Sequence, residues 1–402
     1  MKAVGVIVEY NPFHNGHKFH LDQTKKQADA DVVIAVMSGN FLQRGEPALV
    51  SKWARTEMAL NGGADIVFEL PYFFATQNAD IFATGAVSLL AAANCHSLCF
   101  GSEAGDIHTF TETLDFLNEK NDEFQAKIKE FSSQGVSYPK ALSLSFETLS
   151  PGKHLLDLSK PNNILGLQYV AAIQQQKFAI QPLTITRKNA NYHDQHFASS
   201  SIASATSIRK ALFSVNGSIE GIHSYLPQTT YDLLHNYKKE YRQFHNWEDY
   251  WELLKYKLLL SSPEELRGIH EVEEGLENRL QHAALKANSF QDFMEQIKTK
   301  RYTWTRLQRV SLHILMNVKK AEMTAKKHPE YLRLLGMSAK GQEYLRKEKK
   351  NLHLPLISKL SSNKQLLELD LRAARLYALG LKSKNEQERL LSLDFKQHPI
   401  QL

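Results

Sequence analysis

The N-terminal stretch from Val4 to His20, VGVIVEYNPFHNGHKFH, constrains the fold of this chain more than any other. Its apolar run from Val4 to Val8 is short and rich in β-branched residues, which predicts a buried strand. Asn11-Pro12 ends the strand, because proline has no backbone donor and pushes the preceding residue away from helical angles. A helical segment then runs to Ala28. A strand, a turn and a helix in this order predict the first unit of an α/β nucleotide-binding fold.

The turn between this strand and this helix carries His14, Gly16 and His17. Backbone N–H groups at a helix N-terminus bind anions. Histidines placed there add donors that become cationic as phosphate charge builds up, and a glycine lets a ligand approach the backbone. We predict that the turn binds a nucleotide, with contacts from Ile7, Val8, Glu9, Tyr10, Asn11, Pro12, Phe13, His14, Asn15, Gly16, His17, Lys18, Phe19 and His20.

Further strands are predicted at 31–37, 64–70, 97–100 and 183–187, with helices at 51–61 and 80–93 between them. Strands separated by helical crossovers predict a Rossmann-like parallel sheet with helices on both faces. In such sheets ligands bind beyond the carboxyl ends of the strands. Gly101 follows one of these strands. We predict a catalytic domain over residues 1–223, with Gly101 at a position where backbone approaches the nucleotide.

A second motif, Ser204-Ala205-Thr206-Ser207-Ile208-Arg209, begins a late helix. Hydroxyl and backbone donors at a helix N-terminus hold phosphate oxygens, and arginine adds a cation. Taken alone, the motif is also compatible with an ordinary serine cap. Arg187 and Lys188 end the preceding strand, where paired cations suit a triphosphate, although both could equally be surface charges. We predict that Ser204, Thr206, Arg187 and Lys188 contact the nucleotide and that His14, His17 and Arg209 are catalytic.

Residues 224–402 show helical periodicity and no strand alternation, apart from an extended stretch at 351–361, which predicts a separate helical region. Lysine and arginine crowd this last third, although the net charge of the chain is only +6. Basic clusters neutralise phosphates, and aromatic residues between them can stack on unpaired bases. The sequence therefore predicts an RNA-binding region, with basic clusters at Lys298, Lys300, Arg301, Arg306 and Arg309, at Lys319, Lys320, Lys326 and Lys327, and at Arg346, Lys347, Lys349 and Lys350, and with Tyr302 and Trp304 inside the first.

Together these motifs identify the chain as similar to the tRNA(Met) cytidine acetate ligase family of the HxGH nucleotidyltransferases. The resemblance is carried by 5–17, by 37–41 (MSGNF), by 100–103 (FGSE) and by 160–162 (KPN). It implies that Asn162 contacts the nucleotide. It also implies an ATP-dependent enzyme that activates acetate as acetyl-adenylate, with Mg²⁺, and transfers the acetyl group to the N4 amine of the wobble cytidine of elongator tRNA(Met).

Three alternatives stay open at this stage. A small-molecule adenylyltransferase would use the same HxGH core but needs no basic helical region. An RNA-binding protein without activity would not need the histidines or the second motif, and an aminoacyl-tRNA synthetase is disfavoured because no Lys-Met-Ser-Lys-Ser element is present. A zinc site is the other possible role for His14, His17 and His20, but no carboxylate stands at a helical metal-binding spacing.

Composition limits the location of the protein. No apolar run reaches the roughly 18–20 residues needed for a membrane span. The N-terminus carries no signal-peptide pattern. The two cysteines, Cys95 and Cys99, are expected to be free, buried thiols, with a Cys/His metal site as the less favoured alternative. We therefore expect a cytoplasmic protein without membrane association, and the sequence indicates no protein partner.

Overall fold

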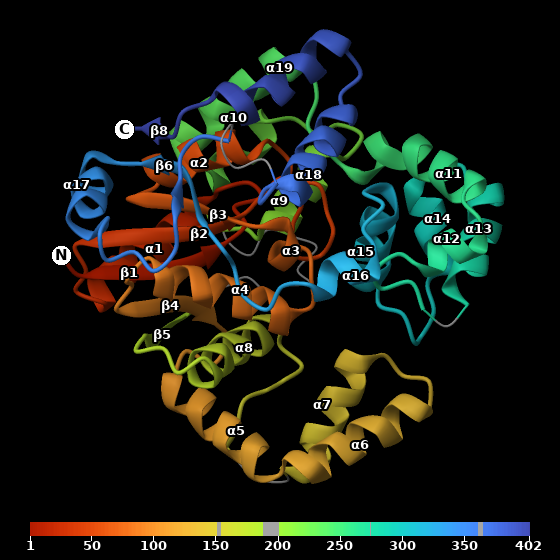
Figure 1. The fold of residues 1–402 in the computed structure, drawn as a ribbon, viewed down its shortest axis with the longest axis horizontal. Helices are drawn as coiled ribbons and strands as arrows, with labels where there is room; N and C mark the ends of the chain where they lie inside the picture. Colours follow the sequence, from red (N-terminus) through yellow and green to blue (C-terminus); the bar gives the residue numbers. More distant parts are fainter. Residues whose placement is uncertain (151–153, 188–200, 274, 361–364) are drawn as a thin grey trace.

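The computed structural model describes residues 1–150, 154–187, 201–273, 275–360 and 365–402. Its centre is an eight-stranded sheet with the strand order β5-β4-β1-β2-β3-β6-β7, in which β8 also pairs with β6 (Figure 1). The strands are β1 (Ala3–Val8), β2 (Val32–Ser38), β3 (Ile66–Leu70), β4 (Ser97–Ser102), β5 (Gln181–Thr186), β6 (Leu332–Met337), β7 (Leu356–Ile357) and β8 (Ile400–Gln401).

The helices of the first half connect and cover the strands or form an arm at one edge of the molecule, where α5, α6 and α7 follow one another (Figure 1). They are α1 (Asn15–Gln27), α2 (Lys52–Asn61), α3 (Tyr72–Ala75), α4 (Ala79–Ala92), α5 (Ile107–Glu119), α6 (Asn121–Ser133), α7 (Tyr138–Leu149), α8 (Pro161–Gln175) and α9 (Ala205–Leu212).

The helices of the second half form two groups. The group from α11 to α16 lies at one side of the molecule, and α17 to α19 return to the sheet (Figure 1). The helices are η1 (Glu220–Tyr225), α10 (Gln228–Tyr241), η2 (Trp247–Tyr250), α11 (Trp251–Leu260), α12 (Pro263–Arg267), α13 (Leu276–Lys286), α14 (Phe290–Ile297), α15 (Trp304–Leu315), α16 (Lys320–Thr324), α17 (Ala339–Glu348), α18 (Glu368–Leu379) and α19 (Lys384–Lys396).

The predicted α/β fold is confirmed. Strands β1 to β5 are parallel, with β1 between β2 and β4. Every residue of β2 and β3 is buried, because helices cover both faces of the sheet. Cys95 and Cys99 are free and buried, as predicted. Within the described ranges, no helix combines the length and the apolar character that crossing a membrane requires.

The C-terminal region is mostly helical, as predicted, but the expectation that only 351–361 departs from the helical pattern was wrong. Strand β6 pairs antiparallel with β3 and extends the sheet, and β7 and β8 pair with β6. Strand β6 escaped detection because its first five residues are all buried, so its sequence shows no alternation of polar and apolar residues. The division into residues 1–223 and 224–402 stays a prediction.

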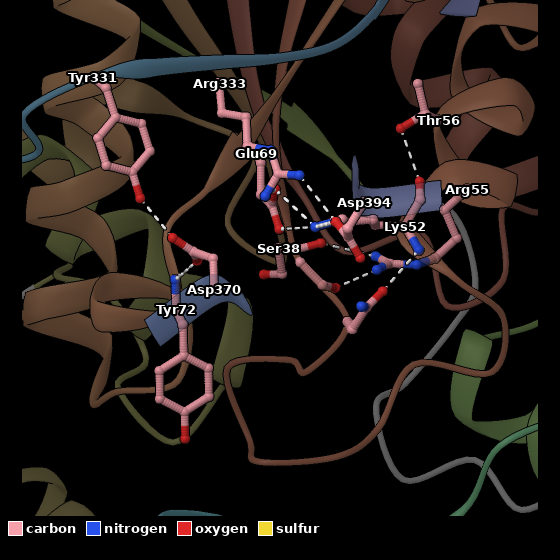
Figure 2. A network of polar contacts seen from close by, with 12 residues as sticks. Ser38, Lys52, Arg55, Thr56, Glu69, Tyr72, Tyr331, Arg333, Asp370 and Asp394 are labelled. Atoms are coloured by element: carbon pink, nitrogen blue, oxygen red, sulfur yellow. Dashed lines mark hydrogen bonds and ion pairs between the residues drawn. The ribbon is translucent and has the colours of Figure 1, made fainter. Parts of the chain in front are cut away.

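A buried cluster of four charged side chains joins the C-terminal helices to the first half of the chain (Figure 2). The Lys52 ammonium lies 3.0 Å from Glu69 and 2.5 Å from Asp394, and the Arg333 guanidinium lies 3.0 Å from Glu69 and 2.9 Å from Asp394. The Lys52 side chain is only 1% exposed. Because unpaired buried charges are strongly unfavourable, each side chain here depends on the other three.

Arg55 of α2, labelled in the same view (Figure 2), holds the carboxyl ends of β1 and β2 in place. Its guanidinium is fully buried and donates hydrogen bonds to the carbonyl of Glu9 at 2.7 Å, to that of Ser38 at 3.0 Å and to that of Gly39. Arg55 thereby satisfies carbonyl groups at the end of β2 and just beyond the ends of β1 and β2, and it holds in place the backbone that leads into the first motif.

Candidate active site

The candidate site lies at the carboxyl ends of β1 and β4. The chain passes from β1 to β2 and β3 on one side of the sheet and returns through α4 to β4 on the other side. A crevice opens where the winding reverses in this way, and open α/β sheets bind their ligands there. Here that place holds a cavity of about 300 Å³, which we call the central cavity.

His14 and His17 cap the first turn of α1 with their own side chains. Nδ1 of His14 accepts a hydrogen bond from the Gly16 amide at 3.0 Å, and Nδ1 of His17 accepts one from the His14 amide at 3.3 Å. The two rings stack with their centroids 3.7 Å apart. Because Nδ1 is an acceptor in both rings, the proton of each neutral imidazole lies on Nε2. Both rings line the central cavity. Because Nδ1 of each ring is used in the cap, the Nε2–H group of each ring is the donor that remains for a ligand.

The charge state of these histidines follows from burial. Burial, reinforced by the positive charges of Arg187 and Arg209, lowers the pKa of His14 to about 3. Burial and Arg187 lower the pKa of His20 to about 4, and the pKa of His17 is also held well below its usual value, chiefly by burial. The histidines are therefore neutral near pH 7. A bound polyanion would favour their protonated forms, because it is an opposite charge in a poorly solvated place.

The second motif reaches the same cavity from α9. Ser204 caps this helix by accepting a hydrogen bond from the Ser207 amide at 3.1 Å, and Thr206 lines the central cavity. Arg209 donates to the Asn11 carbonyl at 2.9 Å and to the Glu46 carboxylate at 2.8 Å. Two helix N-termini and one arginine thus converge on the loop that follows β1, although they are far apart in sequence.

Glu103, at the end of the FGSE motif, joins that motif to the KPNN motif at 160–163. Its carboxylate accepts from Asn162 Nδ2 at 2.7 Å and from the Asn163 amide at 2.9 Å, which caps α8. Gly101 lies against Arg187, and a Cβ at Gly101 would come within 3.3 Å of Arg187 Cγ. Because the Asn162 amide nitrogen is engaged by Glu103, its oxygen is the atom suited to accept a bond from a ligand.

The structure brings most of the predicted site residues to the central cavity. Phe19 and His20, the last two residues of the predicted nucleotide-binding stretch, line it as well. Pro12, Phe13, Asn15 and Lys18 do not line it, and Lys188 lies outside the described residues.

Three of the residues away from the cavity have other contacts. Phe13 is buried in the core, where its ring packs edge-on against Tyr10. The Asn15 side chain donates to the carbonyls of Ser201 and Ser224, and Lys18 pairs with Asp22 on the surface. Phe13 and Asn15 therefore support the residues that line the cavity without lining it themselves. The predicted contact of these residues with a nucleotide stays a prediction.

Sequence reasoning missed one wall of the cavity. Gln43, Arg44 and Glu46 line it from the loop between β2 and α2. The Gln43 amide donates to the Glu9 carboxylate at 2.8 Å, and burial raises the pKa of Glu9. The available signal was the polar run 43–46, which follows a predicted strand after residues 38–42, at the sheet edge where ligands bind.

A parallel sheet with an HxGH turn at its switch point, and with a second helix N-terminus facing the same cavity, defines a nucleotidyltransferase. In agreement, a family model described as HIGH Nucleotidyl Transferase matches residues 1–391. Among the described residues, no group of three or more histidine, cysteine, aspartate or glutamate side chains is placed to hold a metal ion.

Relatives identify the particular family. A protein of Bacillus licheniformis named tRNA(Met) cytidine acetate ligase is 50% identical over 403 residues, which cover 98% of this chain and 97% of that protein. A protein of the same name from a Geobacillus species is 53% identical over 364 residues, 90% of each chain. The chain belongs to the tRNA(Met) cytidine acetate ligase family, as its motifs predicted.

Solved structures agree with this assignment. The crystal structure of Thermotoga maritima TmcAL in its apo form I superposes with a TM-score of 0.92 at 36% identity, and both chains are covered completely. The structure of the same protein bound with alpha-thio ATP, form II, superposes with a TM-score of 0.89 at 35% identity, also over the whole of both chains.

Proposed function

We propose that the protein is an ATP-dependent ligase that forms N4-acetylcytidine at the wobble position of elongator tRNA(Met), with AMP and pyrophosphate as products. The observation that carries the proposal is the convergence of His14, His17 and Arg209 on one buried cavity at the switch point of the sheet. The name of the relatives and the alpha-thio ATP bound by Thermotoga maritima TmcAL support it.

In the first step an acetate oxygen attacks the α-phosphorus of ATP. A new P–O bond forms, the bond between the α-phosphorus and its bridging oxygen breaks, and pyrophosphate leaves with the electron pair. The Nε2–H groups of His14 and His17, the guanidinium of Arg209 and the N-terminus of α9 stabilise the negative charge that builds up on the leaving group. Positioning and charge stabilisation supply most of the rate enhancement, because the protein forms no covalent bond with the substrates.

In the second step the N4 amine of cytidine attacks the acetyl carbonyl carbon of the adenylate. A C–N bond forms, the C–O bond to the phosphate breaks, AMP leaves with that electron pair, and the amine gives up a proton. Arg209 and the histidines hold the phosphate of the adenylate during this transfer. AMP and acetylcytidine are then released.

Mg²⁺ is the expected metal partner of ATP. It binds nucleotides chiefly through phosphate oxygens and its own water molecules, with one or two carboxylates from the protein. Glu9 and Glu46 supply carboxyl groups to the wall of the central cavity, so the residues present fit such an ion. When bound, Mg²⁺ would neutralise charge on the phosphate oxygens.

The tRNA would bind to the basic surface of the C-terminal region. Lys298, Lys300 and Arg301 are exposed there. Arg309, placed in the same cluster from sequence, is only 8% exposed and forms a two-pronged ion pair with Glu271 at 2.9–3.2 Å. Tyr302 is buried as well. Arg309 therefore ties α15 to the segment between α12 and α13, Tyr302 is part of the core, and the proposed surface is formed by the exposed side chains around them.

Incubation with ATP, radiolabelled acetate and bulk bacterial tRNA, followed by nucleoside analysis, tests the function. Label in N4-acetylcytidine supports the ligase. Label that reaches acetyl-adenylate but no nucleoside would instead favour a small-molecule adenylyltransferase. Omitting ATP is the control that separates enzymatic from chemical acetylation.

A further inference from the structure

The loop between β2 and α2 folds into a short hairpin that carries Glu46 to the central cavity. The Ala48 amide donates to the Asn40 carbonyl at 2.9 Å. Nearer the tip, the Leu42 amide donates to the Glu46 carbonyl, also at 2.9 Å. At the tip itself Gly45 has a positive φ of 77°, which glycine adopts without strain. These backbone bonds fix the position from which the Glu46 side chain extends.

Elements of the C-terminal region hold this hairpin in place. A Cβ at Gly45 would lie 2.6 Å from the Arg309 backbone nitrogen of α15, an approach that only glycine permits without a backbone shift. The Tyr377 hydroxyl of α18 donates to the Ala48 carbonyl at 2.7 Å, and both residues are buried. The hairpin is therefore fixed against the C-terminal helices, so Glu46 keeps its place at the cavity although it lies in a loop.

Arg209, the cation of the second motif, is held at two points by the opposite wall of the site. One of its terminal nitrogens donates to the Asn11 carbonyl at 2.9 Å, and the other donates to the Glu46 carboxylate at 2.8 Å. The Arg209 side chain is 19% exposed and that of Glu46 is 29% exposed. Because the donors of a guanidinium form a rigid fork, two acceptors on different nitrogens fix both its place and its plane.

We propose that Glu46 is the positioning residue of Arg209 and holds its guanidinium ready for the charge of the leaving pyrophosphate. The inference rests on the proposed function, in which Arg209 stabilises that charge. A guanidinium has more N–H donors than these two contacts use, so Arg209 can bind phosphate oxygens without leaving Glu46. Groups whose position is set before the substrate arrives stabilise developing charge best, since nothing has to reorganise during the reaction.

The neighbouring charges are compatible with this role. The other carboxyl group of this wall belongs to Glu9, and burial raises its pKa, which favours its neutral form. Burial lowers the pKa of Arg44, while the charges of Glu9 and Glu46 raise it. The Arg209 charge still acts inside the cavity, because it adds to the effect of burial in lowering the pKa of His14. Pairing with Glu46 therefore orients Arg209 without removing its charge from the site.

The test is acetate-dependent exchange of labelled pyrophosphate into ATP, which reports the first step without tRNA. It compares wild type, Glu46→Gln and, as a matched control, Glu322→Gln. The Glu322 carboxylate pairs with Arg372 at 3.0 Å, and Arg372 also donates to a backbone carbonyl, so the control removes the same kind of pair outside the central cavity. Glu46→Gln should lower kcat about 10-fold, because a small displacement of a catalytic group is costly. The control should change kcat less than about twofold.

Two further measurements separate positioning from other roles of the carboxylate. The KM for ATP should change less than about threefold in Glu46→Gln, since the lost effect is exerted mainly in the transition state. In an Arg209→Ala background, Glu46→Gln should cause no additional loss of exchange, because a residue that acts through Arg209 then has nothing to position. A further loss in that background would show that Glu46 acts on the substrates directly, and would overturn the proposal.

The remaining outcomes are equally decisive. An unchanged kcat in Glu46→Gln overturns the proposal, and so does a loss that excess Mg²⁺ restores, which would assign Glu46 to the metal. If circular dichroism shows that Glu46→Gln does not fold, Glu46→Asp decides, because its shorter side chain keeps the charge but not the reach. A kcat equal to that of wild type would then refute the positioning role, and a lower kcat would support it. Absence of acetate-dependent exchange in wild type would refute the proposed function itself.

Discussion

Asn163 Oδ1 accepts two backbone hydrogen bonds from the other side of the site, from the amides of Glu103 and Ala104, both at 3.1 Å. Glu103 in turn caps the helix on which Asn163 lies. The two segments therefore satisfy each other's unpaired backbone groups. The two neighbouring asparagines consequently have different roles. Asn163 is buried and stabilises the fold, whereas Asn162 lines the central cavity.

Asn163→Ala should lower the free energy of unfolding by about 2–3 kcal/mol, because two buried N–H groups lose their acceptor. Urea unfolding followed by circular dichroism measures this loss. Asn162→Ala is the matched control and should change stability much less while it weakens ATP binding. Equal stability losses in the two variants would contradict the division of tasks.

His14→Ala and Arg209→Ala should each reduce acetate-dependent pyrophosphate exchange by about 100-fold or more, the cost typical of removing one preorganised donor to a developing negative charge. His96→Ala, which changes an exposed histidine outside the cavity, is the control. Circular dichroism verifies that each variant is folded. Full activity in either cavity variant would remove that residue from the mechanism.

The buried histidines make stability depend on pH below neutrality. The folded pKa of His14, about 3, lies below the ordinary value of 6.5, so the unfolded chain binds the proton more tightly. Stability is complete above about pH 6.5 and decreases by about 1.4 kcal/mol per pH unit for each such histidine as pH falls toward its folded pKa. Urea unfolding between pH 7 and 5 should show a shallower decrease for His14→Gln than for wild type. Exposed His96→Gln should follow wild type, and identical slopes for all three proteins would contradict the assignment.

Binding of tRNA should weaken with added salt, because phosphate contacts release counterions. Changing Lys298 and Lys300 together to Gln should reduce the slope of log affinity against log salt by about one for each phosphate that the variant no longer neutralises. Fluorescence anisotropy with labelled tRNA measures the slope. The pair Lys382→Gln and Lys384→Gln, exposed at the start of α19, is the control. A flat salt response in wild type would argue against the basic surface as the docking site.

Asp394→Ala should destabilise the protein by about 3–5 kcal/mol, since it leaves Lys52 and Arg333 with Glu69 as the only remaining acid of the cluster. Glu388→Ala, an exposed acid of the same helix, should change stability little. The double variant Lys52→Met, Asp394→Leu should recover part of the loss. Urea unfolding measures all three, and a loss no larger than that of Glu388→Ala would show that the cluster contributes little.

The sequence predicted the parts of the molecule that are determined by interactions between residues close together in the chain. The strand before His14, the turn around Gly16 and the helix cap at Ser204 each depend on a few neighbouring residues, and the structure has all three. The cavity wall at Arg44 could not be predicted in the same way, because its turn is fixed by Arg309, far along the chain. Arg309 itself looked like part of a nucleic-acid surface, since sequence does not show that Glu271 lies beside it.

The buried charge cluster has a consequence for protein synthesis. A nascent chain that has been translated as far as the end of α9 already contains His14, His17 and Arg209. At that point neither Asp394 nor β6, the strand that carries Arg333, has been made. In such a chain Lys52 keeps its ion pair with Glu69, but the second pair, Arg333 with Asp394, is missing, and β6 is absent from the edge of β3. A polypeptide released before β6 is made would therefore leave the backbone groups along this edge of β3 without their strand partner, a place where other chains can pair with it.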